Sequence, residues 1–336
     1  MTMLASNEWG KLKKVVVGVA DHAVMPPVDK SSRTINYAGV KPKKKLFGYG
    51  DEEYLPIKVG AFPEQVIDEA NEDLEVFVKF LEGEGVEVVR PKREPVEYYN
   101  YCPRDSVFVH SNLALATPMP LRSRRGEWRS MREHLPNAIE MPCQYIDELY
   151  NEDCIGNPDV LALNEVTPAF DAANTLRANT DILYLVSNSG NELGAELLQH
   201  QLHEAGCDAD VHLLKDVYSY SHIDTTVAFL REGLILANPS RLKDKDQLPG
   251  PFKEWDVIYC PEAIDIGSYP GYNNMSVWAN MNLFSINPGL VALEEHQEPT
   301  RKLLESHGIE CAMLPMRHQR TLSGGYHCVT LDLERE

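Results

Sequence analysis

Residues 64–91 read EQVIDEANEDLEVFVKFLEGEGVEVVRP, and this stretch shows the structural unit that recurs along the chain. In its first part, apolar residues recur every three or four positions, the spacing of the core-facing side of an amphipathic helix: Ile67, Ala70, Leu74, Phe77 and Leu81. Gly83 and Gly85 then predict the end of that helix. The β-branched run at 86–89, stopped by Pro91, predicts a strand. The unit is therefore helix, glycine turn, strand.

The same unit recurs along the chain. Two clear copies have a helical pattern at 193–205 or 300–307, closed by Gly206 or Gly308 and followed by an apolar run. Two weaker copies have their helical patterns at 128–135 and 252–255, each with a short apolar run after it. Five copies, spaced roughly 50 to 70 residues apart, indicate a repeat architecture.

A second motif follows these strands. Segments 105–118 and 224–239 both run from an aspartate through an apolar strand, a polar turn and a second apolar strand to a proline. Such a repeat cannot bury its apolar face alone, and five of them around an axis would close without exposed edges. The sequence therefore predicts an α/β fold, a five-bladed α/β propeller with pseudo-fivefold repeats, as a single domain over residues 1–336.

The charge and composition of the chain narrow its partners. It has 336 residues, 43% of them hydrophobic, and 32 Lys and Arg against 51 Asp and Glu, for a net charge of −19. This charge disfavours nucleic acid and anionic membranes and favours a cationic small molecule. Because no apolar run reaches about 18 residues and no signal-peptide pattern opens the chain, we expect a cytoplasmic protein. The seven scattered cysteines are expected to be reduced thiols.

In a radial fold, the loop at one position of every repeat faces the same central cavity. The residues at this position share side chains suited to catalysis: Asp105, Asp171, His222, Asp224, Ser276 and Cys328. Each has an ordinary alternative, since an aspartate can cap a turn, a buried cysteine can be inert and a histidine can be a satisfied polar group. Packing alone does not predict the shared position, which therefore favours a catalytic site.

Cys328 is the candidate nucleophile of this site. It precedes a stretch with the two-residue alternation of a strand, so we expect its neighbour His327 to point to the opposite face. The base must then come from elsewhere, and His222 oriented by Asp171 is the candidate. Metal binding by His222 with Asp224 is the alternative, but a metal needs further ligands and no second histidine motif supplies them.

These residues and their neighbours resemble the amidinotransferases of the guanidino-group-modifying superfamily, which include arginine:glycine amidinotransferase. The matching segments span almost the entire chain: 8–18, CPRD at 102–105, FDAA at 170–173, HIDTT at 222–226, NPSR at 238–241, WANMN at 278–282 and SGGYHC at 323–328. The resemblance implies the pentein fold, a five-bladed α/β propeller. It also implies an enzyme without cofactor or metal, in which a cysteine takes the amidino group from L-arginine, releases ornithine and passes the group to an amine.

The resemblance further implies a role for each catalytic residue. Cys328 matches the nucleophile, His222 the general acid and base, and Asp171 its carboxylate partner.

The donor-binding residues follow in the same way. Asp105 and Asp224 match carboxylates that hold the guanidinium of arginine, and Arg241 with Ser276 matches the groups that bind its α-carboxylate. This division suits the chemistry, because a planar cation needs carboxylate acceptors and an arginine side chain forms a fork for a carboxylate.

The acceptor is expected to be glycine or another small primary amine. The glycine enzyme has a methionine directly before its histidine and an asparagine three residues before it, where this chain has Ser221 and Ser219. Ser221 should therefore border a roomier acceptor space, as in enzymes with larger acceptors.

Three alternatives to this activity stay open. They are amidino transfer to a larger amine, hydrolysis of the same intermediate as in arginine deiminase, and a guanidino-binding protein without catalysis. The sequence also leaves the oligomeric state open, a homodimer included.

Overall fold

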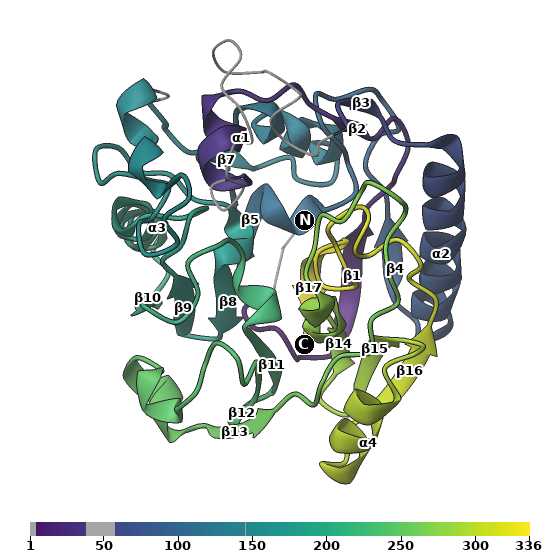
Figure 1. Cartoon of the computed structure of the whole chain (residues 1–336). Coiled ribbons are helices and arrows are strands. Elements are labelled where there is room, and N and C mark those ends of the chain that lie inside the picture. Colours follow the sequence, from purple (N-terminus) through teal and green to yellow (C-terminus); the bar gives the residue numbers. More distant parts are fainter. Residues whose placement is uncertain (1–4, 38–57, 145) are drawn as a thin grey trace.

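The computed structural model describes residues 5–37, 58–144 and 146–336, and Figure 1 shows their sheets arranged around a central axis. These residues form five three-stranded sheets, each built from an antiparallel pair of strands and one strand that joins it in parallel. The expected five-bladed α/β propeller with pseudo-fivefold repeats is therefore confirmed.

Four of the sheets follow one another along the chain, with the hairpin first and the parallel strand last. Their strands are β5 (Val107–His110), β6 (Leu113–Ala116) and β7 (Ile139–Glu140); β8 (Thr175–Ala178), β9 (Asp181–Leu185) and β10 (Asp210–Leu214); β11 (Val227–Arg231), β12 (Leu234–Ala237) and β13 (Asp256–Tyr259); β14 (Phe284–Asn287), β15 (Leu290–Glu294) and β16 (Glu310–Leu314).

The remaining sheet joins the two ends of the chain. Strand β1 (Leu12–Val17) pairs antiparallel with β17 (Thr330–Arg335) and parallel with β4 (Glu87–Val89). In Figure 1 the purple β1 accordingly lies beside the yellow β17. The ring of blades is thus closed by strands from opposite ends of the sequence.

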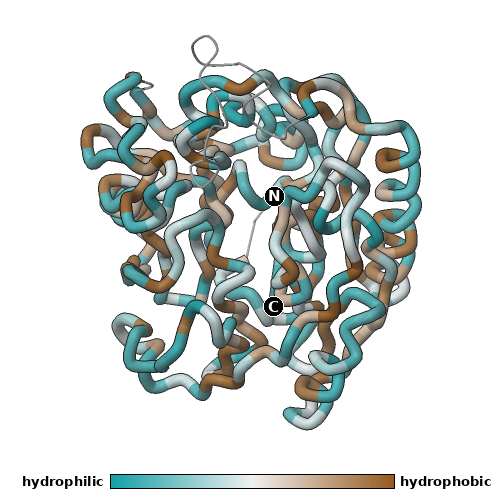
Figure 2. Tube along the Cα trace, in the orientation of Figure 1, coloured by the Kyte–Doolittle hydropathy of each residue, from teal (hydrophilic) through white to brown (hydrophobic). Residues whose placement is uncertain are grey.

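Three α-helices precede the parallel strands of their sheets: α2 (Glu64–Gly83), α3 (Glu192–Glu204) and α4 (Glu298–Ser306). Four of the five residues predicted for the core-facing side of α2 are buried and Ile67 is partly covered. Three further residues of the helix are buried that the pattern did not include: Val66, Asp73 and Val78. The alternating colours along α2 in Figure 2 show this amphipathic pattern. The two weaker copies form 3-10 turns, η4 (Glu127–Met131) and η10 (Gly250–Glu254), because these segments are too short for a stable α-helix.

One end of the ring carries a short helix and a small ribbon that help to enclose the site. Helix α1 (Lys30–Ile35) starts with a capping box, in which the Asp29 carboxylate accepts from the Ser32 N–H at 2.9 Å and the Asp29 N–H donates to Ser32 Oγ at 3.0 Å. The ribbon pairs β2 (Val24–Met25) with β3 (Gly60–Ala61). None of the described helices is long and apolar enough to cross a bilayer, and no disulfide joins any of the seven cysteines, which all lie among the described residues.

A buried network of ion pairs, which the sequence did not predict, links three blades near the axis. Arg177 on β8 binds Glu8 at 2.7 Å and also Asp332 on β17, while Arg104 binds Asp332 at 2.8 Å. Burial alone would raise the pKa of Glu8 and Asp332, but the arginines outweigh it and hold the pKa of both carboxyls below its ordinary value. These residues are scattered in the sequence and meet only after the ring has closed.

Candidate active site

The predicted site residues lie at one level of the ring, where short turns lead into the blades. Asp105 ends η2 (Pro103–Asp105). Three others directly precede a 3-10 turn: Asp171 before η7 (Ala172–Asn174), His222 before η8 (Ile223–Thr225) and Ser276 before η11 (Val277–Met281). Cys328 lies in the turn before β17. Each turn leads directly into a strand of its own blade, so the repeat position read from the sequence is also a position in space.

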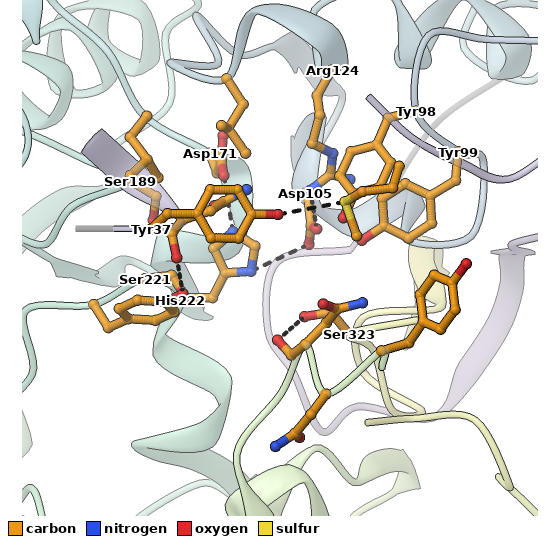
Figure 3. Close-up of a pocket in the computed structure, with 18 of the residues that line it drawn as sticks. Tyr37, Tyr98, Tyr99, Asp105, Arg124, Asp171, Ser189, Ser221, His222 and Ser323 are labelled. Carbon is orange, nitrogen blue, oxygen red and sulfur yellow. Dashed lines mark hydrogen bonds and ion pairs between the residues drawn. The ribbon is translucent and has the colours of Figure 1, made fainter. Parts of the chain in front are cut away.

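A cavity of about 450 Å³ lies beside these turns (Figure 3). Asp105, Asp171, Ser221 and His222 line it. Several tyrosines contribute to the wall: Tyr37, Tyr98, Tyr99, Tyr220 and Tyr272. The cavity therefore offers carboxylates at one end and hydroxyl groups on aromatic rings around it.

His222 is held between two buried carboxylates (Figure 3). Its Nε2 lies 2.9 Å from Asp171 Oδ2, and its Nδ1 lies 3.7 Å from Asp105 Oδ1. Burial lowers the pKa of His222, but Asp105 and the hydrogen bonds with Asp171 and Cys328 outweigh it and hold the pKa well above its ordinary value. The two carboxylates therefore favour the protonated form of the imidazole.

Asp105 is itself fixed by an arginine that the sequence did not single out. Arg124 Nη1 donates to Asp105 Oδ2 at 2.7 Å, and its Nη2 donates to Glu127 Oε2 at 2.8 Å. Burial raises the pKa of Glu127 to about 7, although Arg124 lowers it in part. Arg124 lies in a run of several arginines, so nothing in the sequence distinguishes it from its partly exposed neighbours.

Two carboxylate oxygens of the site have no hydrogen-bond partner in the described structure. They are Asp105 Oδ1 and Asp171 Oδ1, and both are buried. A buried acceptor without a partner is costly, because the carboxylate has lost its water and gained nothing in return. Two such oxygens beside one cavity suit a ligand that brings its own N–H donors and positive charge.

Cys328 and Asp224 lie together behind the lining of the cavity. Cys328 Sγ lies 3.1 Å from Asp224 Oδ2, and the same oxygen lies 3.2 Å from His327 Nδ1. Contact with the Cys102 thiol, burial and the Asp224 charge raise the pKa of Cys328 well above its ordinary value, although a hydrogen bond with His222 opposes them. Burial would raise the pKa of Asp224, but His327 and His222 lower it to about 2.

The predicted separation of His327 from Cys328 is wrong. Residues 326–329 form a turn and the strand begins only at Thr330, so the alternation of strand residues does not apply to them. Both side chains instead meet the carboxylate of Asp224.

The two remaining predicted residues lie outside the lining of the cavity. Arg241 stacks on the ring of Tyr218, with 3.6 Å from its guanidinium carbon to the ring centroid, and its Nη1 donates to the Thr225 hydroxyl at 2.6 Å. Ser276 is exposed to solvent.

The metal interpretation of His222 and Asp224 finds little support in their contacts. The ring of His222 pairs with Asp171, whereas Asp224 pairs with His327 and Cys328. Over residues 5–37, 58–144 and 146–336, no group of three or more His, Cys, Asp or Glu side chains is placed to hold a metal ion.

Comparisons with known proteins agree on one family of enzymes. Inosamine-phosphate amidinotransferase 1 of Streptomyces griseus is 37% identical over 98% of this chain and 96% of its own length. A solved structure of an inosamine-phosphate amidinotransferase from the same organism superposes with a TM-score of 0.87 at 36% identity, covering 99% of this chain and 97% of that chain. The mitochondrial glycine amidinotransferase of Gallus gallus is 28% identical over 98% of this chain and 82% of its own length. No protein-family model matches the chain.

Proposed function

The chain belongs to the amidinotransferase family, and on this premise we propose that it moves the amidino group of L-arginine to a primary amine through an intermediate on Cys328. The observation that carries the proposal is the meeting, beside one cavity, of a buried thiol and a histidine held between two carboxylates. Such a set supplies a nucleophile, an acid that can become a base, and acceptors for a planar cation.

In the first half of the reaction, the Cys328 thiol releases its proton to solvent when the cationic donor binds, and the thiolate attacks the guanidino carbon of arginine. The bond from that carbon to the ornithine nitrogen breaks, and the protonated ring of His222 gives its proton to the departing nitrogen. The raised pKa of His222 favours the protonated ring that this step needs. Asp171 orients the ring through its hydrogen bond to Nε2.

In the second half, the acceptor amine attacks the amidino carbon on sulfur. His222, now neutral, takes a proton from the amine, and the carbon–sulfur bond breaks to regenerate the cysteine. One histidine therefore acts first as acid and then as base, and it ends the cycle in the protonation state in which it began.

The donor guanidinium is proposed to lie against the unpartnered oxygens of Asp105 and Asp171. Asp224 faces Cys328, so its charge would act on the guanidino carbon from the side of the sulfur. Arg241 and Ser276 are proposed for the α-carboxylate because their segments match those of the family. Since neither lines the described cavity, the donor would have to extend beyond it towards Tyr218.

The acceptor is proposed to be larger than glycine, with an aminated cyclitol phosphate as the best candidate. The relatives named for inosamine phosphate are more similar to this chain than those named for glycine. The cavity of about 450 Å³ has far more room than glycine needs, and the small Ser221 is part of its wall. Lys58 also lines it and could face an anionic group of the acceptor. Glycine, the acceptor expected from the sequence, takes second place.

The acceptor proposal is tested by the Ser221→Met variant with arginine and a panel of amines. The wild type should convert a phosphorylated aminocyclitol faster than glycine. Filling the wall with methionine should lower that rate roughly tenfold or more, since about one methylene of fit is worth about 1 to 3 kcal/mol. The measurement is the mass and amount of each guanidino product. An unchanged acceptor profile would remove Ser221 from the acceptor space.

The covalent step is tested by incubating the protein with arginine in the absence of an amine. Intact-mass spectra should show one added amidino group on the wild type and none on Cys328→Ser. Cys260→Ser is a matched control, because Cys260 is equally buried but lies against Thr300 and Asn280 and not against His222 or Asp224, and it should keep the adduct. Citrulline as the main product, with or without amines, would favour hydrolysis over transfer.

A further inference from the structure

The side chain of Asn282 holds Cys328 at two points. Asn282 Oδ1 accepts the backbone N–H of Cys328 at 3.0 Å, and Asn282 Nδ2 donates to Cys328 Sγ at 3.0 Å. Asn282 is almost fully buried and directly follows η11, on a different blade from the cysteine. The amide therefore bridges two blades at the sulfur itself.

The orientation of this amide follows from its partners. A backbone N–H can only donate, so the oxygen of the amide must face it and the NH₂ group must face the sulfur. A further bond supports the contact, since the His327 N–H donates to the Asn282 carbonyl at 3.3 Å.

Gly325 makes the approach of Asn282 possible. A Cβ at this position would lie 2.8 Å from Asn282 Cβ and 2.9 Å from its carbonyl oxygen, closer than real atoms come. The glycine before the Tyr-His-Cys sequence thus serves contact between two blades, in addition to any role beside substrate. This contact places the N–H donor of Asn282 at the Sγ atom of Cys328.

The groups facing Sγ are Asp224, Cys102 and His222. The Asp224 carboxylate opposes a negative charge on the sulfur, and the Cys102 thiol is too weak a donor to offset it. His222 favours the thiolate, but it gives its proton away when ornithine leaves. The Asn282 amide is a neutral donor that keeps its N–H throughout the reaction.

We propose that Asn282 stabilises the thiolate form of Cys328 through the N–H it donates to Sγ, while its oxygen fixes the turn that presents the sulfur. The proposal rests on the proposed function in that Cys328 is the nucleophile. It adds Asn282 as a catalytic residue. A hydrogen bond to a charged sulfur is stronger than one to a neutral thiol, so the Asn282 N–H stabilises the thiolate more than the thiol.

The test measures how fast iodoacetamide alkylates Cys328, with the modified peptide identified by mass, at several pH values below the thiol's pKa. In this range the rate is proportional to the thiolate fraction, so the ratio of variant to wild type reports the thiolate equilibrium. Asn282→Asp keeps the shape but replaces the donor with a carboxylate oxygen, and it should lower the rate roughly tenfold or more.

Asn280→Ala is the matched control. Asn280 is equally buried two residues earlier, and its Nδ2 donates to another thiol, Cys260, at 3.5 Å. This variant should alkylate Cys328 at the wild-type rate. Circular dichroism establishes that each protein is folded, and if Asn282→Asp is not, Asn282→Leu removes the donor without adding a charge.

Equal alkylation rates in the wild type and the folded Asn282 variant would overturn the proposal. The assay contains no arginine and no amine, so it does not depend on transfer. If the wild type formed no amidino adduct but the Asn282 variant still alkylated slowly, the proposed function would fail and the role of Asn282 at the sulfur would stand.

Discussion

The two carboxylates beside His222 differ in the partner that each one binds. Asp171 uses one oxygen for His222 and leaves the other without a partner, whereas Asp105 gives one to Arg124 and leaves the other towards His222. The same carboxylates that raise the pKa of the imidazole can therefore also accept N–H groups from a cationic donor.

This arrangement predicts separate effects on turnover and on binding. His222→Asn should abolish turnover, because it removes the group proposed to carry the proton, and Asp171→Asn should lower kcat by about 10² or more through loss of orientation. Arginine binding should change less. The measurement is steady-state kinetics with arginine and the preferred amine.

A second histidine–aspartate pair offers a control for these variants. His212 Nε2 lies 2.7 Å from Asp181 Oδ1, at a part of the molecule away from the cavity. His212→Asn should keep the wild-type kcat. A raised KM with unchanged kcat in either site variant would move that residue from catalysis to binding.

Among the elements, α2 contributes to the site although none of its residues lines the cavity. Phe77 is fully buried on its inner side and packs edge-on against Tyr326 with ring centroids 4.7 Å apart. Tyr326 belongs to the turn that carries Cys328. The helix predicted first from the sequence therefore supports the turn that holds the nucleophile.

Phe77→Ala should lower the free energy of unfolding by about 3 to 5 kcal/mol, because it leaves a cavity beneath this turn. It should also lower kcat, since Tyr326 loses its support. Thermal or chemical denaturation and kinetics on the folded variant measure the two effects. Val76→Ala is the control on the same helix, because Val76 is 42% exposed, and it should change neither quantity appreciably. A Phe77→Ala protein as stable as the Val76→Ala protein would contradict the packing described.

At the scale of the whole molecule, the ion pairs near the axis hold together segments far apart in the sequence. Arg177 binds Glu8 at 2.7 Å and also Asp332, and all three are buried. Removing one partner of such a group leaves buried charge uncompensated. The net charge of −19 makes unpaired buried carboxylates still less favourable.

Arg177→Met should therefore lower the free energy of unfolding by about 3 to 5 kcal/mol near neutral pH. The folded-state pKa of Glu8 and of Asp332 is below its unfolded value, so their contribution is present above the unfolded pKa and is lost as the pH falls. The difference between wild type and variant should consequently narrow in acid, as measured by denaturant titration at a series of pH values.

Arg301→Met provides the comparison, because Arg301 pairs with Glu298 on the surface of α4 and should leave stability nearly unchanged. A difference between Arg177→Met and wild type that stays constant down to strongly acidic pH would show that the loss comes from packing and not from charge.

The sequence by itself determined the repeat, the blades and the level of the ring at which the candidate site residues lie. Those features follow from local patterns: a helical stripe with a glycine turn and a β-branched run, copied along the chain, and a polar residue at the same point of each copy. The resemblance of short segments also led to the amidinotransferase family. Local patterns suffice here because secondary structure and repeat position depend on residues near one another in the chain.

Only the tertiary structure decided which groups surround the reacting atoms. Arg124 behind Asp105, Asn282 at the sulfur and His327 beside Cys328 were not predicted, and the last was predicted wrongly from a strand that begins two residues later. The contacts of Asn282 with Cys328 and of Asp224 with His327 and Cys328 join different blades, so they depend on how the blades close around the axis. Arg124 reaches Asp105 within one blade, but from a separate segment of it. Distances of 3 Å between side chains are set by that closure, and no periodicity within one segment specifies them.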